Sequence, residues 1–398
     1  MKKYSYIFLI IFFLVGCASN LFARELPLEK IKLPPGFKIS LFAGNLPNAR
    51  TMVLGENKTV FVGTRTAGNV YALRDENKDG KADKKYLIAS GLNMPNGIAF
   101  RNGSLYVAEI DRILRFDGIE KNLAHPPQPK ILHDDLPIET HHGWRYIDFG
   151  PDDWLYIAIG APCNICLEAD YAQIRRMRAD GADKEVFAEG IRNSVGFTWH
   201  PETKELWFTD NGRDWLGDDQ PPGEVNHAAK KGQHFGFPYC HGGTVLDPEY
   251  GKGKSCKNYA PPAQALPAHV APLGIIFYTG KQFPEKYQNQ IFIAEHGSWN
   301  RKKKSGYKIS LIELEENKPV SYTDFAIGWK QGEEAWGRPA YLLNMPDGSL
   351  LISDDKNGVI YRITYQTKNS PLSQRGVRGD LNTVSPSIPL QKGGRLIK

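Results

Sequence analysis

The chain has 398 residues, of which 50 are basic and 44 acidic, so the formal net charge is only +6. Aromatic residues make up 11% of the chain beside 39 Gly and 27 Pro, which is typical of a turn-rich, strand-rich globular protein and excludes a disordered one. The tight basic run in the body, RKKK at 301–304, is better explained by a solvated loop than by nucleic-acid binding. We therefore expect no nucleic-acid partner.

The first residues have the pattern of an export signal. Lys2 and Lys3 precede the apolar stretch YIFLIIFFLVG, which is too short to span a bilayer comfortably. The sequence LVGC that ends at Cys17 resembles the lipobox of bacterial lipoproteins, which implies cleavage before this cysteine and attachment of lipid to its thiol. A plain signal peptide cut near Ala23 is the alternative.

This pattern predicts the order of the N-terminal segments. Residues 1–16 would be removed as a lipoprotein signal peptide, and residues 17–32 would form a linker. We expect an exported protein held by its lipid on the periplasmic side of a bacterial membrane. Ala18 after the cysteine, in place of Asp, favours the outer membrane.

Six divergent copies of one pattern follow: a strand that packs inward, a Gly/Asp/Pro turn and a second, more hydrophobic strand. The copies begin at residues 51, 96, 145, 195, 274 and 340. A four-stranded sheet cannot bury both faces alone, whereas radial stacking of such sheets buries them and leaves only short edges. We therefore predict an all-β fold, a six-bladed β-propeller over 33–366, rather than unrelated hairpins in a sandwich. Residues 367–398 lack an apolar period, and we expect a disordered tail there.

The segment RDENKDGKAD at 74–83 has oxygen-bearing side chains around Gly80, which would bend the loop sharply. These side chains are Asp75, Asn77, Asp79 and Asp83. Hard cations such as calcium bind to alternating oxygen ligands of this kind, so a structural calcium site is one interpretation. The twelfth position is Tyr86 rather than a bidentate Glu, and an ordinary Asp/Gly turn is the alternative.

Two insertions, 163–192 and 213–272, are rich in Pro, Gly and charged residues, and we expect them to be long loops on one face that build the site. Four cysteines, an even number for an exported protein, indicate disulfides. They are Cys163, Cys166, Cys240 and Cys256. Pairing the last two would staple a long loop and pairing the first two would close a small ring, but four cysteines allow three connectivities. A zinc site at CNIC lacks a second ligand pair at the right spacing.

Charged and titratable residues gather at equivalent strand ends of the predicted blades. Such positions converge near the axis of a propeller. A histidine among several arginines around an axial cavity suits removal of a proton from a hydroxyl, with negative charge held by the guanidinium groups. Any one of these arginines alone is better explained by an ion pair at a blade edge, but five clusters in register favour function. The clusters are His141, His142 and Arg145; Arg192 and Asn193; residues 210–214; residues 294–301; and Arg338.

Seven stretches carry a family resemblance. They read HHGWRYIDFGPD, GAPCNIC, GIRNSVGF, TDNGRDWLGDD, HFGFPYCHGG, AEHGSWNR and PDGSLLISDDKNGVIYRI. From about Leu33 to Tyr365 the chain resembles the soluble sugar dehydrogenases that use pyrroloquinoline quinone, and most closely the branch called sorbosone dehydrogenase-like.

The resemblance implies an oxidoreductase that oxidises a sugar, a sugar aldehyde or a polyol, with pyrroloquinoline quinone as hydride acceptor and calcium at the active site. It makes His142, or its neighbour His141, the general base, and Arg192 the residue that polarises the quinone. The backbone carbonyls of Gly212 and Arg213 would bind the calcium. The residues expected to contact the cofactor are His141, Arg145, Asn193, Asn211, His296 and Arg338. The final electron acceptor is unidentified.

The chain also departs from that family. Well-defined members bring a lysine from blade five and two arginines ahead of blade six to the carboxylates of the cofactor. Here His296 stands at the lysine position, and Arg338 is accompanied by Ala340 in place of the second arginine. Arg213 stands where those members have a proline. Two alternatives are therefore open: a catalytically silent surface-binding propeller, and a calcium-dependent lactone hydrolase with side-chain carboxylates around an axial metal.

The two adjacent histidines need separate roles if the backbone is extended, because consecutive side chains of a strand point to opposite faces. His142 would then share a face with Trp144 and Tyr146 and look toward the cofactor. His141 would share a face with Ile147 and pack against the core. A one-residue bulge would reverse this assignment.

Overall fold

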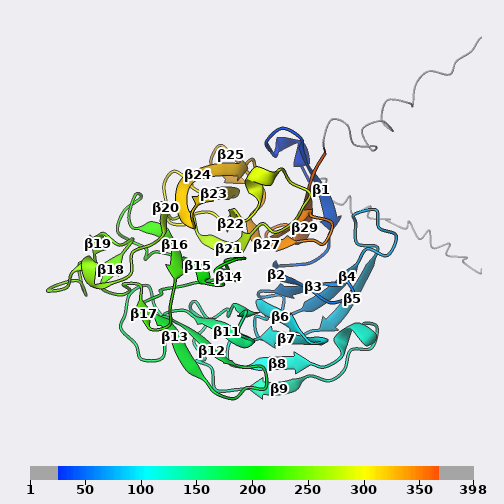
Figure 1. The fold of residues 1–398 in the computed structure, drawn as a ribbon, viewed down its shortest axis with the longest axis horizontal. Coiled ribbons are helices and arrows are strands. Elements are labelled where there is room, and N and C mark those ends of the chain that lie inside the picture. Colours follow the sequence, from blue (N-terminus) through cyan, green and yellow to red (C-terminus); the bar gives the residue numbers. More distant parts are fainter. Residues whose placement is uncertain (1–25, 367–398) are drawn as a thin grey trace, which may run out of the picture.

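The computed structural model describes residues 26–366, so the predicted lipobox, signal peptide and tail lie outside the described residues. Six antiparallel sheets of at least four strands follow one another around a centre (Figure 1). The prediction of an all-β, six-bladed β-propeller is confirmed. Among the described residues, no helix is long and apolar enough to cross a membrane.

Each blade runs from an innermost first strand to an outermost last strand. Blade one is β2 (Ala49–Leu54), β3 (Val60–Thr64), β4 (Val70–Arg74) and β5 (Lys84–Ala89). Blade two is β6 (Gly97–Arg101), β7 (Ser104–Ala108), β8 (Ile113–Phe116) and β9 (Lys130–His133). Blade three is β10 (Ile147–Phe149), β11 (Trp154–Ile159), β12 (Gln173–Arg178) and β13 (Glu185–Glu189), with β17 (Gln233–His234) added in parallel.

The second half of the ring repeats this arrangement. Blade four is β14 (Phe197–Trp199), β15 (Leu206–Asp210), β16 (Pro222–Ala228) and β20 (Gln264–Ala268). Blade five is β21 (Pro272–Phe277), β22 (Ile291–Glu295), β23 (Lys308–Glu315) and β24 (Lys318–Ala326). Blade six is β27 (Pro339–Asn344), β28 (Leu350–Asp354), β29 (Val359–Tyr365) and β1 (Phe37–Ala43). Two small hairpins are β18 (Cys240–His241) with β19 (Val245–Leu246) and β25 (Lys330–Gln331) with β26 (Glu334–Ala335).

Blade six is completed by the N-terminal strand. β1 pairs antiparallel with β29, from Phe37 opposite Tyr365 to Leu41 opposite Tyr361, and the two lie side by side in Figure 1. The end of the predicted linker is also part of the fold, because Lys32 forms a β-bridge with Ile327 and Ile31 is buried in the core of the last two blades. Closure of the ring thus joins two segments more than 300 residues apart in the sequence.

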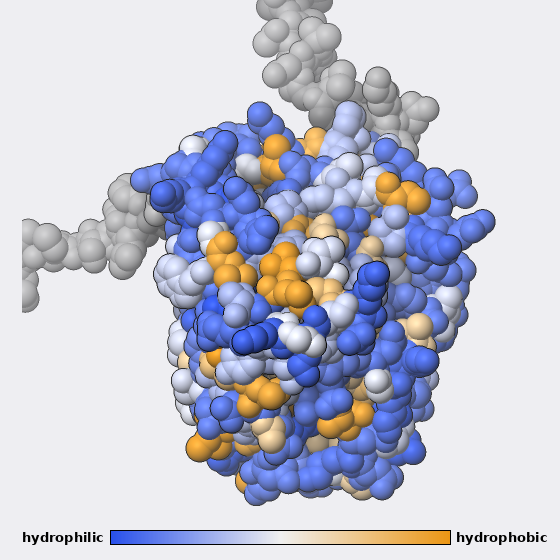
Figure 2. Space-filling view, turned by 90° about the vertical axis from the view of Figure 1, so that its left-hand side faces the viewer, coloured by the Kyte–Doolittle hydropathy of each residue, from blue (hydrophilic) through white to orange (hydrophobic). Residues whose placement is uncertain are grey.

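The burial of the strands explains the repeat seen in the sequence. β22 and β28, which carry the IFIAE and LLISD endings, are buried at every position because neighbouring blades cover both of their faces. The outer strands β5 and β9 are largely exposed. The surface on the side of β18 and β19 is mostly hydrophilic, with separate hydrophobic patches (Figure 2).

The prediction that both insertions are loops is wrong in part. Residues 163–192 contain β12 and β13, and residues 213–272 contain β16 and β20. Some of these strands are rich in charge, as in QIRRMR of β12, and others contain Pro or Gly, as in PGEVNHA of β16 and QALPA of β20. Composition alone therefore could not separate them from loops.

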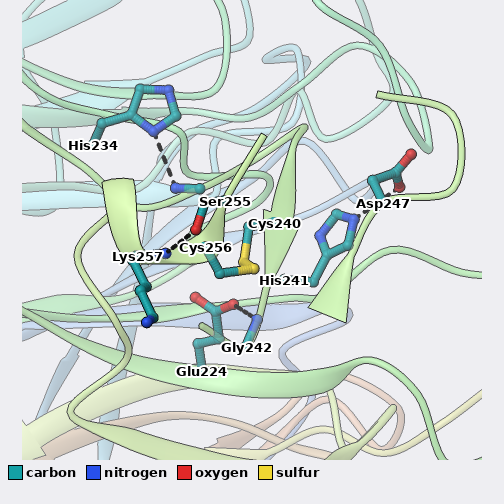
Figure 3. Close-up of a disulfide and its surroundings, with 10 residues drawn as sticks. Glu224, His234, Cys240, His241, Gly242, Asp247, Ser255, Cys256 and Lys257 are labelled. Atoms are coloured by element: carbon teal, nitrogen blue, oxygen red, sulfur yellow. Dashed lines mark hydrogen bonds and ion pairs between the residues drawn. A yellow bond between two sulfur atoms is a disulfide. The ribbon is translucent and has the colours of Figure 1, made fainter. Parts of the chain in front are cut away.

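Both disulfides are present, as Cys163–Cys166 and Cys240–Cys256. The second closes the loop that carries β18 and β19 (Figure 3). Within this loop, the amide of Gly242 donates to Glu224 of β16 over 2.6 Å, and Asp247 contacts His241 at 2.9 Å. The disulfide therefore closes the loop, and the hydrogen bond from Gly242 to Glu224 holds the loop against blade four.

We predict that the Cys240→Ser/Cys256→Ser double variant is less stable than the parent protein by about 3 kcal/mol, because the loop-closure entropy of the unfolded chain is regained. Chemical unfolding under non-reducing conditions measures this difference. The parent protein after reduction is the control. Equal stability of the double variant and the oxidised parent would contradict the prediction.

Candidate functional site

A cavity of about 550 Å³ lies where the entrances of the innermost strands meet the exits of the second strands. Eight of the predicted site residues line it together. They are His141, His142, Arg192, Asn193, Asn211, Gly212, His296 and Arg338. These predicted strand ends therefore lie around one cavity, and the roles assigned to their residues stay predictions.

His142 is fixed by the segment that follows β11. Its Nδ1 lies 2.8 Å from the carbonyl oxygen of Ala161. A carbonyl only accepts hydrogen bonds, so Nδ1 carries the proton and Nε2 keeps its lone pair. Burial lowers the pKa of His142 well below its usual value, and the nearby Arg192 and His141 lower it further. His142 is therefore a neutral imidazole with one free acceptor nitrogen.

Ala161 connects the two predicted catalytic residues through its backbone. Its carbonyl accepts from His142, and its amide donates to the carbonyl of Arg192 over 2.8 Å. The preceding Gly160 leaves room for this arrangement, because a Cβ there would lie 2.7 Å from Cβ of His142 and 2.8 Å from its carbonyl oxygen. The glycine of the GAPCNIC stretch is thus needed for close packing.

The assumption of an extended backbone at the two histidines is wrong. The strand begins only at Ile147, and His142 has a φ of 51°, in the left-handed region. The turn brings both rings to the cavity, with centroids 4.1 Å apart, and leaves His141 exposed rather than packed in the core. The alternation argument for the two faces therefore does not apply, and the choice of His142 as base stays a prediction.

Arg192 is held by two separate segments, at residue 164 and at residues 211–214, and is 3% exposed. Its Nε donates to the carbonyl of Asn164 and its Nη2 to the side-chain oxygen of the same residue, both over 2.9 Å. Its Nη1 donates to the carbonyls of Asn211 and Gly212 at 3.1 and 3.0 Å. Asp214 completes the set with an ion pair at 3.3 Å. The small disulfide ring of Cys163–Cys166 thus supplies Asn164, which sequence reasoning missed.

The backbone around Arg192 is fixed by one buried carboxylate. The two oxygens of Asp210 accept from the amides of Arg192 and Asn193 at 2.9 and 2.7 Å. The carbonyl of Asn193 in turn accepts from the side chain of Asn211 over 3.0 Å. Asp210 is therefore a positioning residue for this loop.

A second cluster of charge lies on the side of blades five, six and one. Asp355 forms an ion pair with Arg50 at 3.0 Å and accepts a hydrogen bond from Nε2 of His296 at 2.8 Å. Arg338 donates to the carbonyl of His296 over 3.0 Å. Arg65 lies over the ring of Trp144, 4.8 Å from its centroid. Arg50, Arg65, Arg192 and Arg338 line the cavity together with Asp214, so its lining has a net positive charge.

Sequence reasoning missed Arg50, Arg65 and Asp355. The register of the blades is the signal that could have found two of them. Arg65 directly follows β3 and Asp355 directly follows β28, just as Asn211 follows β15 and His296 follows β22. Arg50, in contrast, lies one residue inside β2, where the repeat alone does not distinguish it from a core position.

Two predicted residues do not reach the cavity. Arg145 is buried, and it donates to the carbonyls of Ile110 and Pro137 at 2.9 and 2.5 Å, so it ties together the loops of blades two and three. The prediction that Arg145 contacts the cofactor is not supported by the structure. The side chain of Arg213 pairs with Asp247 at 2.5 Å and so lies against the loop of the second disulfide.

The predicted calcium contacts do not fit the arrangement at Gly212. Its carbonyl accepts from Arg192, so a guanidinium already lies at the oxygen that the resemblance assigned to calcium. In the 74–83 loop, Asp75 accepts from the amides of Asp79 and Gly80, and Asp83 from those of Glu76 and Asn77. Among the described residues, no group of three or more His, Cys, Asp or Glu side chains could hold a metal ion. The structure supports an Asp/Gly turn instead of a metal loop at Asp75, Asn77, Asp79 and Asp83.

Comparisons with known proteins place the chain in a family. The TrAA12-like family matches residues 31–366. The chain belongs to the TrAA12-like family. It is 34% identical over 369 residues to an uncharacterized protein of Borreliella burgdorferi, covering 88% of this chain and 94% of that protein.

Solved structures share the fold of this TrAA12-like protein. The iodide structure of a Trichoderma reesei AA12 carbohydrate-active enzyme has a TM-score of 0.75 at 18% identity, covering 84% of this chain and 98% of the other. The holo form of the pyranose dehydrogenase PQQ domain from Coprinopsis cinerea has a TM-score of 0.71 at 18% identity, with 84% and 97% covered. The PQQ-bound aldose sugar dehydrogenase of Streptomyces coelicolor has a TM-score of 0.61 at 18% identity, with 84% and 100% covered. The predicted resemblance to quinone-dependent sugar dehydrogenases is confirmed.

We predict that His142 stays neutral, with the proton on Nδ1, at pH values well below 6.5, because burial and the charge of Arg192 oppose protonation. Nuclear magnetic resonance of ¹⁵N-labelled histidines across pH 4 to 8 measures both the tautomer and the titration. The His142→Gln variant assigns the signal. A titration near the ordinary histidine value, or a proton on Nε2, would contradict the prediction.

Proposed function

We propose that this TrAA12-like protein oxidises a hydroxyl group of a sugar, sugar aldehyde or polyol, with pyrroloquinoline quinone as the hydride acceptor. The observation that carries the proposal is the neutral His142, whose free Nε2 belongs to a residue lining a cavity with four arginines. A base and a cationic wall are the two elements that oxidation of an alcohol by an anionic cofactor requires.

The residues of the cavity fit the cofactor. Pyrroloquinoline quinone carries three carboxylates, and guanidinium groups bind carboxylates through paired hydrogen bonds. Arg50 and Arg65 supply cations that offset the missing lysine and second arginine of the better-defined sugar dehydrogenases. The buried Nε of Arg65 has no hydrogen-bond partner among the described residues, so the protein leaves its hydrogen-bonding capacity unused.

In the proposed reaction, Nε2 of His142 accepts the proton of the substrate hydroxyl as hydride leaves the carbon that bears this hydroxyl. The bound quinone would supply the two-electron acceptor. The carbonyl of Ala161 keeps Nδ1 protonated and stabilises the charge that develops on the imidazole. Arg192, fixed by its backbone contacts, holds positive charge beside this base. The protein would thus remove the proton, and the cofactor would accept the hydride.

The structure disfavours both alternatives. A silent binding propeller does not need a base with a set tautomer. The four arginines of the cavity can bind the cofactor carboxylates even though the lysine and the second arginine of the family are absent. A calcium-dependent lactone hydrolase needs side-chain carboxylates that converge on a metal. Asp210 is engaged by two backbone amides, and Asp214 by Arg192 and Asn300.

The proposal includes the location of the protein. We propose an exported, lipid-anchored protein on the periplasmic side of a bacterial membrane, supported by the lipobox-like LVGC sequence and by the two disulfides. The Cys17→Ser variant is expected to leave the membrane fraction, because its thiol can no longer carry lipid. Unchanged fractionation would contradict lipid attachment at this cysteine.

We expect purified protein to bind pyrroloquinoline quinone with a bound-quinone spectrum and then to reduce a dye with sugars or polyols. The His142→Ala variant should keep the spectrum and lose about 10²- to 10⁴-fold in turnover, because a general base contributes that much. His125→Ala, a change at an exposed histidine outside the cavity, is the matched control. Failure to bind the quinone would overturn the proposal.

Repeating the quinone-binding measurement after removal of calcium tests whether binding needs the metal. The resemblance predicts calcium at Gly212, whereas the structure has the guanidinium of Arg192 there. Loss of quinone binding after removal of calcium by a chelator would show that binding needs the metal, as the resemblance predicts. Unchanged binding would show that the quinone binds without the metal.

A further inference from the structure

Two tryptophans stand out at the mouth of the cavity. Trp215 is 68% exposed and Trp299 is 67% exposed, although neither lies at a described chain end. Their rings are perpendicular, with centroids 5.5 Å apart. Trp299 lines the cavity, and Trp215 directly follows the lining residue Asp214. The other large exposed apolar side chains of the described residues are all aliphatic.

The backbone of Trp215 is in an unfavourable conformation. Its φ of 71° lies in the left-handed region, which bulky residues rarely adopt and which costs of the order of 1–3 kcal/mol. Such strain persists only where the surroundings impose it, and it occurs often at ligand sites. In this protein the strained residue, Trp215, has an indole ring that is exposed to water.

The two loops that carry the tryptophans are braced against each other. Asn300 donates to Asp214 over 2.6 Å, and Arg301 pairs with Asp219 at 2.8 Å. Nε2 of His269 contacts the carbonyl of Gly217 at 2.8 Å. The tryptophan pair is thus a supported surface at the rim, continuous with the cavity, rather than two isolated exposed side chains.

We propose that Trp215 and Trp299 form a saccharide platform, which binds the sugar units next to the one that enters the cavity. The protein would therefore act on the end of an oligosaccharide or polysaccharide. The inference rests on the proposed oxidation of a sugar, and it adds the class of substrate. Flat indole rings bury the apolar C–H face of a pyranose, and their few rotamers make ordering them inexpensive in entropy.

The surroundings favour a saccharide over a protein partner. Hydrogen-bonding groups such as Asn300 and Asp218 lie in the same loops, where the hydroxyl groups of a sugar ring need partners. Arg301 and Asp219 neutralise each other, and the carboxylate of Asp218 lies beside Lys302 of the same basic run. The two loops therefore carry charges of both signs rather than a field of one sign that would steer a charged redox protein. A site of two aromatic rings also has the size of one or two sugar units.

The test uses the full mature protein without added quinone, so that it is independent of the proposed oxidation. Binding of glucose, cellotetraose, maltotetraose and chitotetraose is measured by calorimetry and by quenching of tryptophan fluorescence. We expect at least one tetrasaccharide to bind more tightly than glucose. Trp215→Ala should weaken that binding by about 10-fold, the scale of one aromatic contact. Trp215→Phe should retain most of it.

Val320→Ala, at an exposed apolar residue of the outer strand β24, is the matched control and should bind as the parent protein does. Melting temperatures of all variants exclude unfolding as the cause of a loss. Equal affinity for glucose and every tetrasaccharide, or tetrasaccharide binding unchanged in Trp215→Ala, would overturn the platform. Quinone binding without tetrasaccharide preference would overturn this inference alone and leave the proposed oxidation standing. If the tryptophan variants impaired only electron transfer to a protein acceptor, the surface would belong to that partner instead.

Discussion

Pairing of β1 with β29 closes the ring of blades, and the cavity exists only because the ring is closed. An open array would leave the faces of the first and last sheets in water and would separate Arg50 of blade one from Asp355 of blade six. Closure brings these two side chains to 3.0 Å. The ion pair therefore bridges the seam between the first blade and the last, beside the cavity.

The cavity concentrates positive charge, and burial of these guanidinium groups costs hydration free energy. Neutral oxygens compensate for this loss as much as carboxylates do. Arg192 is nearly fully buried, and four of its hydrogen bonds go to Asn164, Asn211 and Gly212. Burial of a cation is tolerated when all its donors are used in this way. Burial keeps His142 neutral and the charge of Arg192 adds to this effect, so the arrangement that holds positive charge for an anionic cofactor also helps to keep the base unprotonated.

The candidate site was predictable where it follows the repeat. Asn211 and His296 occupy the position after the second strand of their blades, and the convergence of such positions is a property of any propeller. The two histidines were not predictable in the same way, because the left-handed turn at His142 interrupts the alternation on which the argument depended. Arg145 shows the opposite failure, since its charge and its place near the other residues do not reveal that backbone carbonyls engage its guanidinium.

The sequence by itself determined the number of blades and the second strand of each blade, because hydrophobic alternation and the spacing of turns are local properties of the chain. Only the tertiary structure decided which charged residues share a cavity. Arg50, Arg65 and Asp355 are far apart in sequence from His296, and the direction of each side chain depends on how the blades pack. The tautomer of His142 was decided in the same way, by a carbonyl 19 residues away that the fold brings to its ring.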